Sequence, residues 1–398
     1  MKIFVVNCGS SSIKYQLFDM PSEKVLASGV IERLGDEQSE LKYETDEGSW
    51  RTNVQAPDHA VGLKIILDKL VSSPGGVLDS IDQIDGVGHR VVHGGAEAVG
   101  SVIIDQDVIA MLERNVDLAP LHTPPNLLGI QAASEVIGPG RHVGVFDTAF
   151  LATLPEKAYR YPVPDEWYKE HQVRRYGFHG TSHKYVTSCA AEILDKSPDD
   201  VNLITVHMGN GVSMPAVSAG QAVDHSMGMT PLEGLMMGTR SGDIDPAIVF
   251  YMISRGLSSE QVDEALNKRS GLAGISGRSD MRDLVAAEAQ GDAEAALAIE
   301  MFIYRIVKYI GSYYAILPPL DAIVMTGGIG ENSTRVRGRI CQSLNRLGVI
   351  VDLEANEKIR GGASGVITTQ DSKPPVWVIP TNEEVMIARE TFRLVADK

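Results

Sequence analysis

Residues 3–18 read IFVVNCGSSSIKYQLF: a four-residue apolar run, a polar turn, and a second apolar run with partial alternation. Apolar runs of this length, bounded by Asn, Gly and Ser, are typical of β-strands, so residues 7–12 are expected to join two antiparallel strands. Residues 24–31 have the composition of a third strand. The chain is therefore predicted to begin with an antiparallel meander.

The same pattern returns in the second half of the chain, where residues 203–217 read LITVHMGNGVSMPAV. Repetition of one supersecondary unit indicates a duplication, with strand and helix crossovers after each meander. Helical apolar spacing supports such crossovers in residues 60–70, 258–269 and 292–317. We therefore predict an α/β protein with two similar domains.

Length and charge limit the classes of protein to which this chain can belong. At 398 residues it exceeds the roughly 250–300 at which a single core stops growing, so two domains are expected. The net charge of −16 argues against nucleic acid as a partner, because a phosphate backbone is bound by excess Lys and Arg. Arg335, Arg337 and Arg339 form the strongest basic cluster, which we interpret as a solvated helix face.

Cysteine content and hydropathy indicate a cytoplasmic protein without a membrane partner. The three cysteines are far apart and lack Cys-x-x-Cys spacing, which suggests neither a disulfide framework nor a thiolate metal site. The first apolar run ends at Asn7 and is too short for a signal peptide. Charged residues interrupt the apolar helix predicted at 292–317, so no membrane span is expected.

Three polar or glycine-rich turns follow predicted strands, at residues 7–12, 207–213 and 326–332. Small residues let backbone amides reach phosphate oxygens, and the hydroxyl groups of Ser10 and Ser12 add hydrogen-bond donors. The chain contains neither a Walker A pattern nor a full Gly-x-Gly-x-x-Gly, so the commonest nucleotide-binding folds lose support. One such turn is usually only a turn, but three in a duplicated chain indicate phosphate binding.

Nine segments together resemble the motifs of acetate kinases, in the same order and at similar spacing. They are NCGSSSIKYQLF from residue 7, GHRVVHGG from 88, APLHTPPN from 119, VFDTAF from 145, YGFHGTSH from 176, HMGNGVS from 207, SMGMTPLEGLMMGTRSGDIDP from 226, TGGIGENS from 326 and PTNEE from 380. This resemblance covers residues 7–384. It implies the duplicated ribonuclease-H-like fold of the actin-like ATPases, with an active-site cleft between two domains.

The resemblance also implies domain boundaries and an assembly. The N-terminal ribonuclease-H-like domain would comprise residues 1–149 and about 384–398, and the C-terminal domain would comprise residues 150–383. The C-terminal domain would bind the nucleotide and form the interface of a homodimer.

A protein of this family would reversibly transfer the γ-phosphoryl group of ATP to acetate by direct in-line displacement, giving acetyl phosphate and ADP. An acid with a pKa of about 4 is ionised at pH 7 and needs no base to become a nucleophile. Two anions must still be brought together, which requires cations around the transferred group. Arg90 and Arg240 lie in the matching motifs, and a guanidinium can hold carboxylate or phosphoryl oxygens at two points.

The resemblance gives His179 and Asp147 further catalytic roles. His179 corresponds to a residue that stabilises the transition state by a hydrogen bond to a transferring oxygen. The spacing of His179 and His183 also permits zinc ligation, although no third ligand is fixed by spacing. Asp147 ends the apolar run 142–146, where a carboxylate can orient an arginine or bind Mg²⁺ through water, and we favour positioning over proton abstraction.

The resemblance also implies sites for the metal, the nucleotide and the acid. Asn7 and Glu383 match the magnesium positions, with Mn²⁺ as an alternative ion, although Glu383 also suits the first turn of a helix. Lys14 matches a contact to the nucleotide phosphates. Further nucleotide contacts would be His207, Met208, Gly209, Asn210, Gly211, Asp280, Met281, Arg282, Gly328, Ile329, Gly330, Glu331 and Asn332. The methyl group of acetate would lie against Val92, Leu121, Phe178 and Pro231, near His122.

Other functions stay open from the sequence alone. A propionate or butyrate kinase would perform the same reaction in a larger pocket. An ATP-binding structural protein or chaperone, similar to actin or Hsp70, would explain the three turns but not two arginines that serve a small acid. A metal hydrolase is the weakest alternative. The expected partners are ATP and acetate, with Mg²⁺ as the cofactor.

Overall fold

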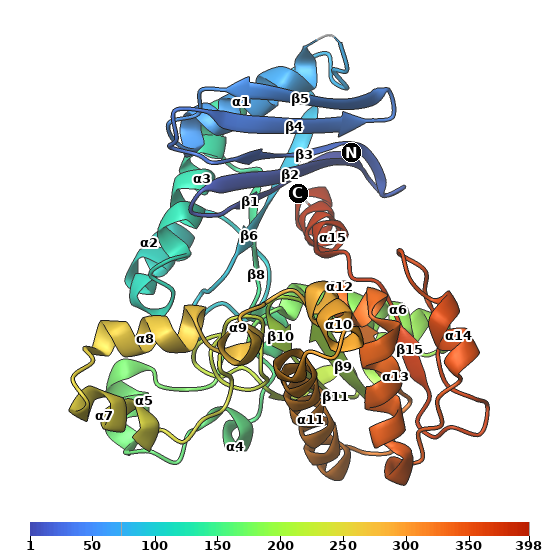
Figure 1. Cartoon of the computed structure of the whole chain (residues 1–398). Helices are drawn as coiled ribbons and strands as arrows, with labels where there is room; N and C mark the ends of the chain where they lie inside the picture. The colour runs from blue at the N-terminus through green and yellow to red at the C-terminus, as the bar shows by residue number, and fades with distance from the viewer. Residues whose placement is uncertain (73, 398) are drawn as a thin grey trace. The chain divides into compact units, whose positions relative to one another are not determined.

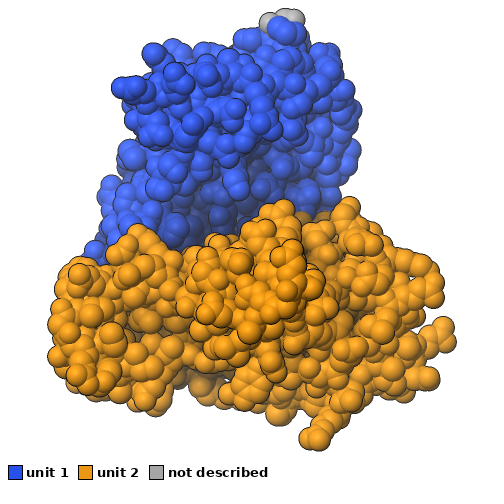
Figure 2. Space-filling view, in the orientation of Figure 1, with its two compact units in different colours: residues 1–152, 382–398 blue, residues 153–381 orange. Residues whose placement is uncertain are grey.

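The computed structural model describes residues 1–72 and 74–397. The chain divides into two compact units, Met1–Ala152 together with Asn382–Lys398, and Thr153–Thr381, which Figure 2 colours separately. Each unit is built on one mixed β-sheet with helices packed against it (Figure 1). The α/β class predicted from the sequence is therefore confirmed.

The sheet of the first unit has eight strands in the order β5-β4-β3-β2-β1-β6-β8-β7. Its strands are β1 (Lys2–Cys8), β2 (Ser12–Asp19), β3 (Lys24–Glu32), β4 (Ser39–Thr45), β5 (Gly48–Val54), β6 (Ile84–Val91), β7 (Val102–Ile103) and β8 (His142–Phe146). Its helices are α1 (His59–Val71), α2 (Gln106–Arg114), α3 (Thr123–Ile137) and α15 (Glu383–Ala396), with short 3-10 turns at Ile81–Gln83, Val116–Leu118 and Ala149–Leu151. The predicted meander is confirmed as β1, β2 and β3.

The predicted turn at residues 7–12 is shorter than expected. Asn7 pairs with Lys14 and Cys8 with Ile13, so both residues continue β1. The reason is the alternation of β1, which does not stop at the polar Asn7 but buries Cys8 in the core of the unit. Three residues, 9–11, connect the two strands.

Helices cover both faces of the first sheet. Phe4 and Val6 lie in one hydrophobic core with residues of α1 and α3, while Ile3 points to the other face, against α15. Helix α15 runs antiparallel to β6 and packs very close to it, because Gly88 has no side chain: a Cβ there would lie 2.6 Å from Ile387 Cγ2. This close contact brings the first turn of α15 to the carboxyl end of β6.

The sheet of the second unit has the order β12-β11-β9-β13-β15-β14, with β10 paired to β9. Its strands are β9 (Leu203–Met208), β10 (Val212–Ser213), β11 (Pro215–Ser218), β12 (Gln221–His225), β13 (Ala322–Thr326), β14 (Gly365–Val366) and β15 (Val376–Val378). Its helices are α4 (Glu156–Tyr159), α5 (Asp165–His171), α6 (Gly180–Ile193), α7 (Ala247–Ser254), α8 (Ser259–Lys268), α9 (Gly271–Ser276), α10 (Met281–Ala289), α11 (Ala293–Ile316), α12 (Gly327–Asn332), α13 (Thr334–Ser343) and α14 (Leu353–Lys358), with 3-10 turns at Pro198–Asp200 and Asn345–Leu347.

The two sheets share one topology. The order β3-β2-β1-β6-β8 in the first unit corresponds to β12-β11-β9-β13-β15 in the second. In both, an antiparallel meander is followed by two strands parallel to its first strand. The duplication predicted from the repeated sequence pattern is confirmed.

The predicted helices are found as α1, α8 and α11. Helix α8 begins with a capping box between Ser258 and Gln261, and α11 buries Ile299, Ile303 and Ile306 on one face. In the part of the chain that the structure describes, no helix, α11 included, combines the length and the apolar character that a membrane crossing requires.

The expectation of a solvated arginine face on α13 is wrong for one of the three arginines. Arg335 and Arg339 both pair with Glu288 at the protein surface. Arg337 is fully buried, with no exposed surface. The reason is that its guanidinium group is surrounded by hydrogen-bond acceptors from segments that are distant in the sequence.

Candidate active site

The carboxyl ends of β6 and β8 bring together three of the predicted residues in the first unit. Arg90 donates from Nη2 to Asp147 Oδ2 at 2.5 Å and from Nε to Asp147 Oδ1 at 3.2 Å. Glu383, in the first turn of α15, lies with Oε2 3.6 Å from Arg90 Nε. The side chain of Asp147 is only 2% exposed, whereas Arg90 and Glu383 are each about a fifth exposed. Arg90 is thus held at two points by a buried carboxylate.

The charges of Arg90, Asp147 and Glu383 together favour the binding of an additional cation. The negative charge of Asp147 raises the pKa of Arg90 above its usual range, despite the opposing effect of burial. Burial raises the pKa of Glu383 to about 7; the charge of Arg90 lowers it, while Asp147 and Glu384 raise it further. An ionised Glu383 is therefore costly in this structure and would be stabilised by an additional cation.

The turn after β1 lies at the same edge of the sheet as Arg90. Strand β1 is parallel to β6, with Val6 opposite His89, so Asn7 follows at the level of Arg90. Ser10 and Lys14 are exposed, as phosphate contacts must be. His59, a residue that the sequence did not single out, anchors the turn through a 2.7 Å hydrogen bond between its Nε2 and the carbonyl oxygen of Gly9.

Mg²⁺ fits the chemistry of these side chains. It prefers oxygen ligands, keeps several waters, and is usually bound by one or two carboxylates together with substrate phosphates. Asn7 offers an amide oxygen, and Glu383 offers a carboxylate whose pKa is raised mainly by burial, so that a bound cation would favour its ionised form. Between residues 1–72 and 74–397 no group of three or more His, Cys, Asp or Glu side chains forms a metal-binding cluster.

In the second unit, His179 belongs to a chain of hydrogen bonds that joins separate segments. Its Nδ1 lies 2.9 Å from Ser213 Oγ, and Ser213 Oγ lies 2.7 Å from His183 Nε2. His183 Nδ1 in turn lies 2.7 Å from Thr205 Oγ1. Burial lowers the pKa of His183 well below its usual value, so this ring is neutral. The hydroxyl of Ser213 therefore connects His179 to a fixed, neutral partner.

This arrangement does not support the zinc alternative. Both ring nitrogens of His183 are hydrogen-bonded to hydroxyl groups, which leaves no lone pair for a metal. His207 is occupied in a similar way, since its Nδ1 lies 2.8 Å from Ser182 Oγ, which also contacts Thr381 Oγ1. The rings of His179 and His207 lie with centroids 4.6 Å apart.

Arg240 approaches His179 above the glycine turn of residues 209–211. A Cβ atom built on Gly211 would lie 3.1 Å from His179 Nε2 and 3.8 Å from Arg240 Nη1. The polar contacts of Arg240 are weak: Pro231 O at 3.4 Å and Met237 Sδ at 3.8 Å from Nη1. No acidic side chain among the described residues pairs with Arg240, and burial lowers its pKa. A partly desolvated cation and a histidine nitrogen thus both border the space above Gly211.

A buried clamp, which the sequence analysis missed, fixes the segment that leads to Arg240. Arg175 donates from Nη1 to His225 O at 2.7 Å and to Met227 O at 2.9 Å, and from Nη2 to Glu233 Oε1 at 2.7 Å. Tyr161 donates to the same carboxylate of Glu233. The spacing of residue types in the sequence did not predict this clamp, because its acceptors are mainly backbone carbonyl groups, which every residue type has.

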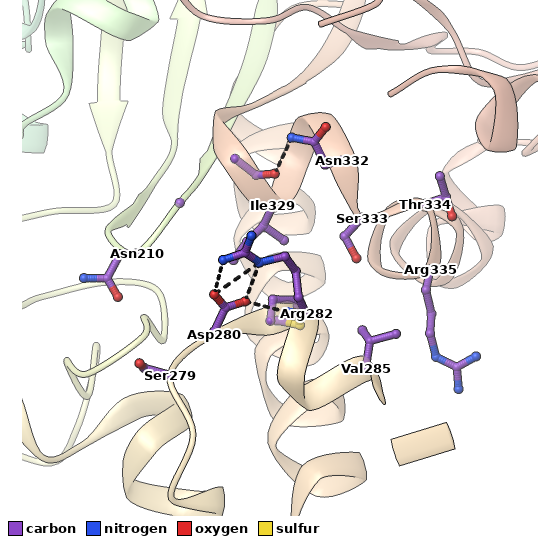
Figure 3. A pocket seen from close by; sticks show the side chains of 13 residues that line it. Asn210, Ser279, Asp280, Arg282, Val285, Ile329, Asn332, Ser333, Thr334 and Arg335 are labelled. Carbon is purple, nitrogen blue, oxygen red and sulfur yellow. Dashed lines mark hydrogen bonds and ion pairs between the residues drawn. The ribbon is translucent and has the colours of Figure 1, made fainter. Parts of the chain in front are cut away.

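The second unit contains a cavity of about 780 Å³, and Figure 3 shows the side chains that line it. It is lined by Gly209, Asn210, Ser279, Asp280, Met281, Arg282, Val285, Gly328, Ile329, Asn332, Ser333, Thr334 and Arg335. Three segments that the sequence analysis assigned to the nucleotide, near residues 209, 280 and 328, therefore meet around one space. In this view Asn210 and Arg335 lie at opposite ends, and Arg282 is paired with Asp280 at 2.6 Å.

Several of the expected nucleotide residues face elsewhere. The side chain of Met208 is fully buried. Glu331 turns its carboxylate inward, where Oε1 accepts from Gly327 N at 2.9 Å and from Thr381 N at 3.1 Å. His207 and Gly211 belong to the neighbourhood of His179 and Arg240, and Gly330 is buried. Glu331 thus holds the start of α12 in place.

The residues expected around the acid are divided between the two units. Val92, Leu121 and His122 belong to the first unit, and Phe178 and Pro231 to the second. Val92 is held by a hydrogen bond from its backbone N–H to Asn126 Oδ1 at 3.1 Å. Leu121 is 73% exposed, which is unusual for a large apolar side chain, whereas Phe178 is buried beside His179.

Comparisons with known proteins show which chains are similar in sequence and in structure. The model of the acetokinase family matches residues 2–389. An acetate kinase of Carboxydothermus hydrogenoformans is 52% identical over 401 residues, covering 100% of each chain. Among solved structures, an acetate kinase of Porphyromonas gingivalis has a TM-score of 0.95 at 46% identity, covering 99% of each chain. A propionate kinase of Francisella tularensis has a TM-score of 0.92 at 39% identity, again covering 99% of each chain.

Proposed function

Because the chain belongs to the acetokinase family, we propose that it transfers the γ-phosphoryl group of ATP to the carboxyl group of acetate, reversibly giving acetyl phosphate and ADP. The observation that carries this proposal is that Arg240 Nη1 and His179 Nε2 both lie within 4 Å of the position that a Cβ atom on Gly211 would occupy. Phosphoryl transfer needs cations and hydrogen-bond donors around the equatorial oxygens, and little covalent chemistry from the protein.

Arg240 is the residue that we assign to the transferred phosphoryl group. A half-buried arginine without an acidic partner is stabilised when an anion joins it, and a phosphoryl group is such an anion. His179 Nε2 then donates to an oxygen of the same group as negative charge develops there. Since Gly211 has no side chain, the two donors can reach the same oxygen-bearing group without obstruction.

Arg90 is the residue that we assign to the carboxylate of acetate. Its Nε and Nη2 are held by Asp147, so the group is oriented and Nη1 stays available for a second anion. Acetate is ionised at neutral pH and needs no base. Asp147 is also almost inaccessible and already bound to Arg90, so we assign it to positioning rather than to proton transfer.

The cavity in Figure 3 is the proposed nucleotide site, since its volume lies within the roughly 300–1,000 Å³ of small-molecule sites. Lys14, Ser10 and Ser12 are the proposed phosphate contacts of the first unit. Asn7 and Glu383 are the residues that would hold Mg²⁺. When bound, this ion would neutralise charge on the phosphate oxygens.

A propionate kinase is the second candidate, because one structural relative carries that name at 39% identity. The two activities differ in the space left for the acid's alkyl chain. Acetate is favoured here because the acetate kinases of Carboxydothermus hydrogenoformans and Porphyromonas gingivalis are 52% and 46% identical to this chain, more than the 39% of the propionate kinase. Val92, Leu121, Phe178 and Pro231 are the proposed wall of that space, with His122 beside it.

A panel of formate, acetate, propionate and butyrate, each with ATP and Mg²⁺, tests the proposal directly. Hydroxylamine converts each acyl phosphate to a hydroxamate, which is measured by colour, while ADP is measured in parallel. We expect acetate to give the highest kcat/KM and hydroxamate equal to ADP. ADP formed without any acid would instead indicate an ATPase of the actin or Hsp70 type, and a preference for propionate would select the second candidate.

We also propose that the chain forms a homodimer through its second unit. Helix α7 has the sequence AIVFYMIS and no buried residue. Its side chains Ile248, Phe250, Tyr251 and Ile253 are 40–72% exposed, and an exposed apolar patch of this kind indicates an interface. Light scattering of Phe250→Asp should report a monomer, while a dimer unchanged by this charge would exclude α7 from the interface.

Two further proposals rest on less specific features. We propose that the units Met1–Ala152 with Asn382–Lys398, and Thr153–Thr381, are the folding domains of the chain. We propose a cytoplasmic location because Cys8 and Cys341 are buried thiols that form no disulfide bond.

A further inference from the structure

Arg337 carries a positive charge into the interior of the second unit without an acidic partner. Its side chain has no exposed surface, and it is the largest side chain among the fully buried residues. No ion pair joins it to any residue in the described ranges 1–72 and 74–397. Burial lowers its pKa to about 10, so the group is still protonated at neutral pH. A charge in this position must be stabilised by hydrogen bonds alone.

The acceptors around Arg337 come from two directions. On one side, Nη1 donates to Gly330 O at 2.9 Å and to Glu331 O at 2.7 Å, near the end of α12. On the other side, Nη2 donates to Asn356 O at 2.9 Å and to Ile359 O at 2.6 Å, and Nε donates to Asn356 Oδ1 at 3.0 Å. All three guanidinium nitrogens therefore have partners, and four of the five acceptors are backbone carbonyls.

Two of these acceptors, Gly330 O and Glu331 O, belong to the segment that forms one wall of the cavity. Residues 328–335 supply one side of that cavity, and Arg337 holds them from behind at Gly330 and Glu331. Asn356 supports the same wall directly, because its Nδ2 donates to Thr334 O at 2.8 Å. A second connection joins Gly361 N to Asn332 Oδ1 at 3.0 Å. The segment 356–361 thus acts as a support to which the wall is attached mainly through Arg337.

We propose that Arg337 is a positioning residue for the nucleotide: it fixes the wall 328–335 against the segment 356–361 without contacting the ligand. This proposal rests on the proposed nucleotide site and assigns a residue that determines its shape. A planar guanidinium suits this task because five N–H groups point in fixed directions. A lysine in its place offers three donors at a single point and would leave carbonyls on at least one side without a partner.

The test compares Arg337→Lys with Arg339→Lys, a matched control on the same helix. Arg339 is partly exposed, pairs with Glu288 and does not line the cavity. Losing about one or two buried hydrogen bonds should raise the KM for MgATP and the Kd for MgADP of Arg337→Lys roughly 10-fold or more. The KM for acetate and kcat at saturating MgATP should stay within about threefold of the unsubstituted protein. Arg339→Lys should match the unsubstituted protein in all four constants.

Hydrogen exchange adds a readout that a general loss of stability would not reproduce. Amides of residues 327–335 should exchange faster in Arg337→Lys, whereas β9 and α11, in the same unit, should keep their protection. If Arg337→Lys fails to fold, Asn356→Ala tests the inference in its place. This substitution removes the side-chain acceptor of Arg337 Nε and the donor to Thr334 O. We expect it to weaken MgADP binding about three- to tenfold.

Three outcomes would overturn the inference. The first is an unchanged Kd for MgADP in folded Arg337→Lys, or in Asn356→Ala where that variant decides. The second is a parallel rise in the KM for acetate, and the third is an equal effect of Arg339→Lys. Failure of the unsubstituted protein to bind MgADP would count against the proposed function itself, which makes the two failures distinguishable.

Discussion

The two arginines proposed to bind anions are held in opposite ways. Arg90, in the first unit, is bound at two points by the buried carboxylate of Asp147 and lies near Glu383. Arg240, in the second unit, has no acidic partner among the described residues and only weak contacts to a carbonyl and a sulfur atom. The pKa of Arg90 is raised by its neighbour's charge, whereas that of Arg240 is lowered by burial.

This difference teaches how one side chain can serve two tasks. In the proposed reaction, Asp147 neutralises most of the charge of Arg90, so Arg90 would give acetate, with its single charge, an oriented but mild binding partner. Arg240 keeps its whole charge in a partly desolvated place, so it would interact most strongly with the highly charged phosphoryl group. We therefore propose that the first unit provides orientation and the second unit electrostatic stabilisation.

Among the substitutions that test this difference, removal of Arg240 is expected to have the largest effect on kcat. Arg240→Ala should lower kcat on the order of 10³-fold, by analogy with arginines at other phosphoryl-transfer sites. Arg240→Lys should recover little, because an ammonium group cannot form the two-point contact. Steady-state kinetics on the folded variants measures both effects. More than about a tenth of the original kcat in Arg240→Ala would reject the assignment.

Asp147→Asn removes the carboxylate that binds Arg90 at two points, so that Arg90, like Arg240, would no longer be held in this way. The amide keeps the shape of the carboxylate but not its charge, so Arg90 is no longer held at two points. A misplaced binding group can cost about 10²-fold, and we expect a loss of that order in kcat/KM for acetate. The KM for ATP should change little. Equal kcat/KM for acetate before and after the substitution would show that Asp147 does not orient Arg90.

Ser213→Ala tests the surroundings of Arg240 in the second unit, where His179 is nearby. Without this hydroxyl, His179 Nδ1 loses its connection to His183. One lost hydrogen bond that matters in the transition state corresponds to about a 10-fold drop in kcat. Ser213→Thr retains the hydroxyl group and should recover most of the lost kcat. If Thr behaves like Ala, the hydroxyl is not the feature that matters at this position.

The smallest effect is expected beside Arg90, at Val92. One methylene of mismatch is worth roughly 1–3 kcal/mol, so acetate should exceed propionate about 10- to 200-fold in kcat/KM. Val92→Ala enlarges the proposed pocket and should reduce that ratio, mainly by improving propionate, while the KM for ATP stays nearly constant. Kinetics of both acids on both proteins gives the ratio. An unaltered ratio would place Val92 outside the pocket.

The sequence predicted the elements of the fold better than their interior contacts. Repeated apolar runs around residues 3–18 and 203–217 predicted two meanders, because burial on a sheet leaves a periodic pattern. The burial of Arg337 left no such pattern. Its acceptors at residues 356–359 come close to Arg337 only in the folded chain. From its place in the helix alone, Arg337 was therefore expected on a solvated face.

The candidate site shows the same limit. Motifs identified Arg90, His179 and Arg240 as residues worth examining, although their roles stay predictions. Ser213, which lies between two histidines, was not singled out, because a lone serine in a turn carries no distinctive spacing. Hydrogen bonds that connect distant segments are recognisable only once the sheet and its helices are assembled.

Helix α15 has a consequence for the order in which the chain folds during synthesis. It belongs to the first unit, where it covers β6 and buries Val385, Met386 and Ile387, yet it follows the whole second unit in the sequence. Domains generally fold from the N-terminus as the chain leaves the ribosome. We therefore expect one apolar face of the first sheet to stay uncovered until residues 383–396 emerge. We expect the second unit to fold earlier, so that the unit whose translation begins first would be the one completed last.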